Sequence, residues 1–297
     1  MSVTVGIISP GDMGSAIGQR LASNGARVVV ALDARSERTK SLAAQAGLED
    51  VGSVERLVAE SSHILSVMVP SEAPSAAERV AQALRSTGAT SCYADCNAIA
   101  PETTKRVGEI VEAAGARFVD AGIIGGPPRG TVTPRIYASG PHAAELAVLN
   151  EYGLKIPVIG DVVGQASGLK MCYAALTKGL QALGTELLVS ARLLGLEDAL
   201  RAELVSSQPA LREWLAKSVL GMPPKAHRWI GEMEEIAQTF ADVGLTPKIL
   251  EGAADMYRWI ATTPLGHETP ENRDKNRDLD GVIAALAETL TPSKTTA

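Results

Sequence analysis

A glycine-containing segment near the start of the chain has the residue types and spacing of a dinucleotide-binding turn. In VGIISPGDMGSAIG, an apolar run over residues 4–8 leads into a turn, and a helical pattern follows. The GxGxxG pattern falls on Ser9, Gly11 and Gly14, so serine replaces its first glycine. Gly11 lets the backbone approach a pyrophosphate, Gly14 allows close helix–strand packing, and the helix N-terminus attracts phosphate. The alternative is a turn that only packs. The expected cofactor contacts are Ser9, Pro10, Gly11, Asp12, Met13 and Gly14.

The end of the second apolar run, ALDARSER, carries conflicting signals about the cofactor. Asp33 lies about 20 residues after Gly14, where an acid binds the ribose hydroxyls of NAD. Arg35 and Ser36 follow at once, and a guanidinium grips a 2′-phosphate with two N–H groups. In the alternative interpretation these residues only solvate and cap the next helix, with Ser36 as its N-cap. We favour NADP and keep NAD as the alternative.

Lys170 lies in the first turn of a long helical pattern that begins in GQASGLKMCYAALTKG. A helix N-terminus and burial both disfavour the charged ammonium, so a lysine there could carry a proton near neutral pH. The other interpretation is an ordinary solvent-facing lysine. At about 100° per residue, Thr177 returns to nearly the same face of the helix. Of the four histidines, His227 alone falls in a plausible cleft segment.

These residues must be held in place by secondary structure, and the sequence shows two different patterns of it. Up to residue 163, short apolar runs alternate with helical stretches, which predicts a doubly wound, mostly parallel α/β sheet. From residue 164 the pattern is helical throughout, which predicts an all-α domain over 164–297, joined by a long helix from about Gln165. Asn97 follows a strand at the carboxyl edge of the sheet, either as a ligand-binding side chain or as a turn former.

Composition narrows the classes of function. A net charge of −6 without a basic run, and only 3% aromatic residues, argue against a nucleic-acid partner. We expect no membrane span, because no apolar segment reaches about 18 residues. The three cysteines form no CxxC pair and no zinc-type cluster, so we expect no metal and a reducing, cytoplasmic setting.

Five segments in the same order resemble the β-hydroxyacid dehydrogenase family, which is related to 6-phosphogluconate dehydrogenase. GIISPGDMGSAIGQRLASNG resembles the family's GxGxMGxxMAxNLxxxG, and SVMVPS resembles its second cofactor loop, which adds Val69 and Pro70 to the expected cofactor contacts. DCNAIAP resembles DxSTxxP and adds Asn97. DAGIIGG resembles the substrate-binding DAPVSGG, and GQASGLKMCYAA resembles GxxxKxxxN. The resemblance implies a Rossmann domain followed by an all-α domain, and Lys170 as the catalytic general acid/base.

Three departures from the family pattern concern the substrate. Ile124 stands at the serine of DAPVSGG, Gly122 at its proline, and Ala174 at the asparagine of KxxxN. Gly125 and Gly126 remain, so backbone N–H groups could still bind a carboxylate. We therefore expect a more apolar pocket at Ile124, and a hydrogen bond from Thr177 in place of the missing amide.

The leading hypothesis is an NAD(P)-dependent dehydrogenase acting on a β-hydroxyacid-like alcohol. An imine or ketone reductase on the same scaffold is an alternative, although the resembling imine reductases generally lack the lysine. A dinucleotide-binding sensor without catalysis is a third. The resemblance also suggests a homodimer through the helical domain, and a carboxylate-bearing small molecule as substrate.

Overall fold

The computed structural model describes residues 3–33, 35–269 and 272–290, which form two compact units that divide between Cys172 and Tyr173. We call them the sheet domain and the helical domain. The division lies beyond the expected boundary at residue 163, because the first turns of the long helix pack with the sheet domain.

The sheet domain contains one eight-stranded sheet with the order β3-β2-β1-β4-β5-β6-β7-β8. Neighbouring strands are parallel except β6 and β7, which are antiparallel. The chain reverses direction of travel across the sheet after β3, which makes it doubly wound, as predicted. The strands are β1 (Thr4–Ile8), β2 (Arg27–Val30), β3 (Glu49–Asp50), β4 (His63–Ser66), β5 (Cys92–Asp95), β6 (Arg117–Ile124), β7 (Arg135–Ser139) and β8 (Val158–Gly160).

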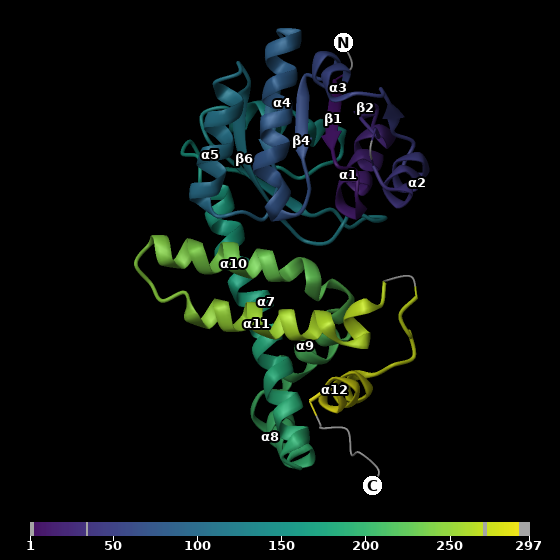
Figure 1. Ribbon diagram of the computed structural model, residues 1–297, viewed down its shortest axis with the longest axis vertical. Coiled ribbons are helices and arrows are strands. Elements are labelled where there is room, and N and C mark those ends of the chain that lie inside the picture. The colour runs from purple at the N-terminus through teal and green to yellow at the C-terminus, as the bar shows by residue number, and fades with distance from the viewer. Residues whose placement is uncertain (1–2, 34, 270–271, 291–297) are drawn as a thin grey trace. The chain divides into compact units, whose positions relative to one another are not determined.

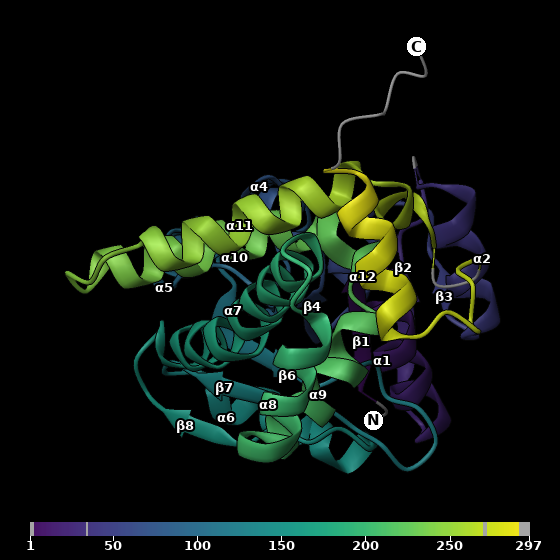
Figure 2. The same cartoon turned by 90° about the horizontal axis from the view of Figure 1, so that it is seen from below.

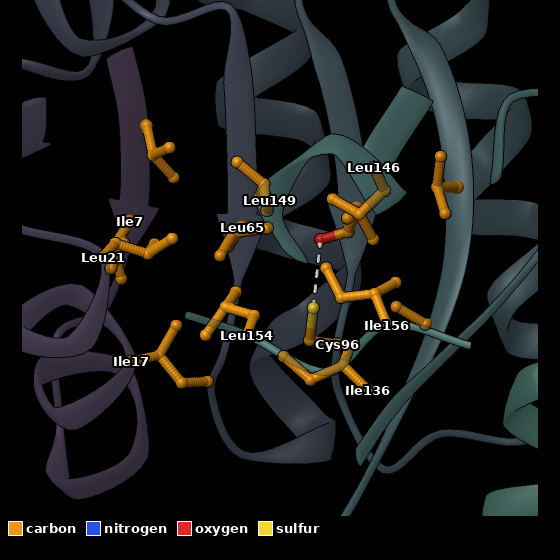
Figure 3. Packing of buried hydrophobic residues seen from close by; sticks show 14 of the residues in the cluster. Ile7, Ile17, Leu21, Leu65, Cys96, Ile136, Leu146, Leu149, Leu154 and Ile156 are labelled. Atoms are coloured by element: carbon orange, nitrogen blue, oxygen red, sulfur yellow. Dashed lines mark hydrogen bonds between the residues drawn. The ribbon is translucent and has the colours of Figure 1, made fainter. Parts of the chain in front are cut away.

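Helices cover both faces of this sheet, and each face has its own apolar core. Ile17 of α1 and Leu146 of α6 pack against one face (Figure 3). Leu57 of α3, Leu84 of α4 and Val107 of α5 pack against the other; Figure 1 shows α4 and α5 in front of the strands. The helices are α1 (Asp12–Ser23), α2 (Glu37–Gln45), α3 (Val54–Glu60), α4 (Ala73–Thr87), α5 (Pro101–Glu112) and α6 (Ala143–Leu146), with 3-10 turns η1 (Pro70–Glu72) and η2 (Ala147–Tyr152).

The second half of the chain is helical, as predicted, and the residues described there include no strand. It begins within α7 (Gln165–Leu193), whose first residues up to Cys172 belong to the sheet domain. α10 and α11 lie side by side and pack extensively against each other (Figures 1 and 2). The other elements are α8 (Glu197–Ser207), α9 (Pro209–Leu220), η3 (Pro223–Lys225), α10 (Ala226–Asp242), α11 (Lys248–Thr262), η4 (Pro264–His267) and α12 (Leu279–Glu288).

Two short regions escaped the sequence analysis. The segment EDVGSVERLVAE forms β3 and α3, whose N-cap Ser53 accepts a hydrogen bond from Arg56 N at 3.3 Å. Residues 143–152 form α6 and η2. Both are too short for a clear periodic pattern, and burial of Leu57 and Leu149 against the sheet stabilises them.

Candidate active site

The turn between β1 and α1 has the backbone geometry of a phosphate cradle. Ser9 adopts φ of +66°, the left-handed conformation that glycine enters most easily, and its carbonyl accepts a hydrogen bond from Gly11 N at 2.8 Å. A Cβ on Gly14 would lie 2.9 Å from that carbonyl oxygen, whereas one on Gly11 would meet nothing within 4 Å. Serine therefore takes the conformation of the missing glycine, and the space over Gly11 is open to a ligand.

The N-terminus of α1 is available to an anion. Gly11 is its N-cap and supplies no side-chain hydrogen bond, so no side chain caps the first N–H groups of the helix. Asp12 in the first turn would repel a phosphate, but its carboxylate pairs with Arg38 at 2.8 Å. Arg38 therefore neutralises the acid closest to the phosphate position.

Among the residues after β2, Ser36 has a structural role, whereas Asp33 and Arg35 are candidates for contact with a cofactor. Ser36 is the N-cap of α2 and accepts a hydrogen bond from Thr39 N at 3.3 Å, so its capping interpretation is confirmed. Asp33 is exposed, and Arg35 is half-buried. Burial lowers the pKa of Arg35, the positive charge of Arg79 lowers it further, and the negative charge of Glu72 opposes this shift. Arg35 is thus a partly desolvated guanidinium whose charged form an anionic ligand would stabilise.

The expected second cofactor loop sits on a buried polar network. Val69 is exposed and Pro70 begins η1. The Asn97 side chain is buried: its Oδ1 accepts from Met68 N at 2.6 Å, and its Nδ2 donates to Ser66 Oγ and Asp95 Oδ2, both at 3.0 Å. The amide of Asn97 therefore supports the loop from inside the protein, which fits its interpretation as a turn former better than direct contact with a cofactor.

Lys170 is half-buried in the sheet domain, where the start of α7 packs on β6. A Cβ on Gly122 would lie 2.7 Å from Ala166 O and 3.0 Å from Lys170 Cβ, so the helix approaches the strand as closely as glycine allows. The Lys170 amine makes no hydrogen bond or ion pair within the described part of this domain. Burial lowers its pKa to about 8.

The expected contribution of the helix dipole to this pKa needs correction. The N–H groups that open α7 donate to the carboxylate of Asp120, through Gly164 N at 2.8 Å, Ala166 N at 3.0 Å and Ser167 N at 3.1 Å. A carboxylate at the helix N-terminus opposes the positive end of the dipole. Loss of water around the ammonium is therefore the cause of the lowered pKa of Lys170.

The residues at the end of β6 continue the surface that faces α7. Side chains alternate along a strand, so Ile124 lies on the same face as Asp120 and Gly122. Ile124 is 7% exposed. Gly125 follows with φ of +129°, and a Cβ on it would lie 3.1 Å from Pro134. A Cβ on Gly126 would meet nothing within 4 Å. Both glycines are exposed, so their backbone N–H groups can be reached by a small molecule.

The remaining predicted residues belong to the helical domain. Thr177 donates to Tyr173 O of its own helix at 3.2 Å, and His227 is exposed in the first turn of α10. Burial and the charge of Arg228 lower the pKa of His227. The structure describes each domain by itself, so the predicted roles of Thr177 and His227 stay predictions.

Sequence reasoning missed one polar cluster of the helical domain. Lys178 forms a largely buried ion pair with Glu232, its amine lies 5.3 Å from the centre of the Trp229 ring, and its carbonyl accepts from Tyr257 Oη at 2.6 Å. The helical spacing of Trp229 and Glu232, three residues apart, was the available signal. Nothing in the sequence indicated that Lys178 would meet them.

The residues that the structure describes include no group of three or more His, Cys, Asp or Glu side chains that could hold a metal ion. Nor is any helix among them long and apolar enough to cross a membrane.

Comparison with known proteins agrees with this geometry. The family profile for the NAD binding domain of 6-phosphogluconate dehydrogenase matches residues 4–160. The chain belongs to this family. Residues 191–260 match a second profile, a domain of unknown function. The turn over Gly11 is therefore part of an NAD(P)-binding domain.

Similar proteins include an uncharacterised 28.5 kDa protein of Methanothermus fervidus, 29% identical over 86% of this chain and 98% of its own. A solved conserved protein of unknown function, described as structurally similar to 3-hydroxyacid dehydrogenases, is 32% identical, with a TM-score of 0.67 over 87% of this chain and 98% of its own. The 3-hydroxyisobutyrate dehydrogenase of Mycobacterium tuberculosis, solved with L-serine, is 18% identical, with a TM-score of 0.70 over 98% of this chain and 99% of its own. The chain therefore has the fold of the 3-hydroxyacid dehydrogenases.

Proposed function

We propose that the protein is an NAD(P)-dependent oxidoreductase that interconverts a β-hydroxyacid-like alcohol and its carbonyl form, with Lys170 as general acid/base. The observation that carries the proposal is the half-buried Lys170 amine, without a partner in the described sheet domain and with a pKa of about 8, in the domain that binds the nicotinamide cofactor. A general acid/base works best when its pKa lies near the operating pH.

The residues of the turn between β1 and α1 fit the pyrophosphate of such a cofactor. Ser9, Gly11 and Gly14 shape the cradle, and the uncapped N-terminus of α1 provides N–H donors and a positive dipole end. Val69 and Pro70 extend the contact surface from the next loop. The nicotinamide ring, when bound, accepts a hydride from the alcohol carbon or donates one to the carbonyl carbon.

Lys170 completes the reaction by moving the proton. In the oxidising direction the neutral amine takes the proton of the alcohol oxygen as the carbonyl forms. In the reducing direction the ammonium returns that proton to the developing alkoxide. A pKa of about 8 leaves both forms of Lys170 populated close to neutral pH, so one residue serves both directions.

We propose NADP as the preferred cofactor, on the basis of Arg35. A half-buried guanidinium close to the positive charge of Arg79 is better stabilised with a 2′-phosphate than without one. Asp33 is the residue that would favour NAD instead. Turnover measured with both cofactors decides between them, and a clear preference for NAD rejects this part of the proposal.

The substrate we propose carries a carboxylate and a larger or less polar group than a short hydroxyacid. Ile124 supplies an apolar wall where the resembling family has a serine. The exposed backbone at Gly125 and Gly126 can donate to a carboxylate. Thr177 and His227 are the residues of the helical domain that we propose for substrate orientation.

We further propose a cytoplasmic homodimer that assembles through the helical domain. A groove between α7 and α11 is lined mainly by apolar side chains. Its lining includes Leu176, which is 64% exposed, and Ile249, which is 76% exposed. A second copy is the partner that we propose to cover these side chains. Sedimentation of the purified protein at micromolar concentration tests this; a monomer rejects it.

The decisive experiment is a cofactor-dependent screen of hydroxyacids, carbonyl compounds and imines, with the wild type and Lys170→Met. We expect turnover of hydroxyacids, no turnover by Lys170→Met, and cofactor affinity within about 3-fold of the wild type, since Lys170 acts on the proton. Retained turnover would falsify the role of Lys170. Saturable cofactor binding without turnover of any compound would support a sensor.

A further inference from the structure

One buried carboxylate organises the start of the helix that carries Lys170. Asp120 on β6 is 0% exposed. Besides the backbone N–H groups of Gly164, Ala166 and Ser167, it accepts from two hydroxyls: Ser139 Oγ at 2.9 Å and Ser167 Oγ at 3.3 Å, both to Oδ2. Ser139 on β7 also accepts from Ala166 N at 2.9 Å. Asp120 thus joins two strands and the first turn of α7 in one network.

This network aligns with Lys170 because of strand geometry. Asp120, Gly122 and Ile124 alternate onto one face of β6. Asp120 receives the N–H groups of Gly164, Ala166 and Ser167, and Gly122 faces Ala166 O and Lys170 Cβ. Strand and helix therefore run in the same direction, with the carboxylate anchor one helical turn before Lys170.

A carboxylate is the suitable group for this anchor. It presents only acceptors, and every surrounding atom within hydrogen-bond distance is a donor. Burial raises the pKa of Asp120 above its usual range, and the donated hydrogen bonds limit this rise because they favour the ionised form. An asparagine would turn an NH2 group toward some of these N–H donors and leave buried groups unsatisfied.

We propose that Asp120 is a positioning residue: it fixes the first turn of α7 so that the amine of Lys170 is held, partly dehydrated, at the reaction centre. The inference rests on the proposed function for its catalytic meaning. Asp120 itself touches neither substrate nor cofactor in this scheme. It acts through the helix N-terminus, and Gly122 transmits the position to Lys170.

The test measures the titration of Lys170 in Asp120→Asn by ¹³C NMR of the reductively methylated protein, with the signal assigned by its loss in Lys170→Met. We expect loosening of the helix start to admit water and to raise the pKa of Lys170 from about 8 towards the ordinary value of 10.5. We also expect kcat to fall by about 10-fold or more with KM within about 3-fold, since misplacement of a catalytic group by about 1 Å costs up to about 100-fold.

The matched control is Asp95→Asn. Asp95 is also a buried carboxylate, on the neighbouring strand β5, but it accepts hydrogen bonds from Asn97 and not from α7. We expect it to leave the Lys170 titration unchanged. An unchanged or lower pKa of Lys170 in Asp120→Asn, or an equal rise in Asp95→Asn, overturns the positioning role.

A second variant keeps the test valid if Asp120→Asn does not fold. Ser139→Ala removes one donor to Asp120 and one acceptor for Ala166 N. We expect a smaller rise of the pKa of Lys170, and no rise overturns the proposal. The titration needs no substrate, so its outcome is separate from that of the proposed function: a protein without turnover can still show the coupling, and an active enzyme can lack it.

Discussion

The Lys170→Met variant should be more stable than the wild type at neutral pH. Burial lowers the pKa of Lys170 from 10.5 to about 8, so the folded protein binds fewer protons than the unfolded chain between these two values. Below pH 8 the native state carries the full free-energy cost of a partly dehydrated ammonium. The cost falls as pH rises, because the unfolded chain then also loses its proton. Methionine has a similar length and no charge, so it avoids the cost.

The size of the effect follows from the two pKa values. A difference of 2.5 pH units between 10.5 and 8 corresponds to about 3 kcal/mol at pH 7 and about 1.5 kcal/mol at pH 9.5. Residual solvent contact of a half-buried side chain reduces this to about 1–3 kcal/mol at pH 7. Each kcal/mol shifts the melting temperature of a domain of this size by about 2–4 °C.

The assay is urea unfolding of the wild type and of Lys170→Met at pH 7 and pH 9.5, with the m-values compared to confirm the same transition. Lys178→Met is the matched control on the same helix. It removes the partner of Glu232, a largely buried carboxylate, and should destabilise the helical domain by about 2 kcal/mol or more. If Lys170→Met is no more stable than the wild type at pH 7, or if its advantage grows with pH, the assignment of Lys170 as a dehydrated amine is wrong.

Three further predictions use the same geometry. The kcat/KM for alcohol oxidation should rise with pH and level off above about 8, where Lys170 is neutral, whereas that for carbonyl reduction should fall; pH-independent profiles contradict the role of Lys170. Gly122→Ala should lose about 1–3 kcal/mol in urea unfolding, because its Cβ would lie 2.7 Å from Ala166 O. Gly126→Ala has open space at its Cβ position, so its free energy of unfolding should stay within about 0.5 kcal/mol of the wild type. An equal loss of stability in both variants rejects the packing argument. Arg35→Ala should raise the KM for NADP by about 10-fold with little change for NAD, and equal effects on both cofactors remove Arg35 from the phosphate site.

Local patterns in the sequence determined the architecture. Alternation of short apolar runs with helical stretches predicts the doubly wound sheet, and the apolar run over residues 4–8 agrees with β1. The spacing of Gly11 and Gly14 after β1 predicts the cofactor turn, and the helical pattern from Gln165 predicts α7. These features depend on residues close together in the chain, so periodicity and turn chemistry are sufficient to find them.

Tertiary structure alone decided which polar residues are free to act. The Ser36 side chain caps α2 and the Asn97 side chain is hydrogen-bonded in the interior, whereas Arg35 and Lys170 are half-buried. The sequence predicts Lys170 in the first turn of α7; the structure places it one turn later, and its dehydration depends on the contact of these first two turns with Gly122, far away in the chain. A pKa responds to every neighbour in space, and those neighbours come from strands and helices whose pairing no local pattern encodes.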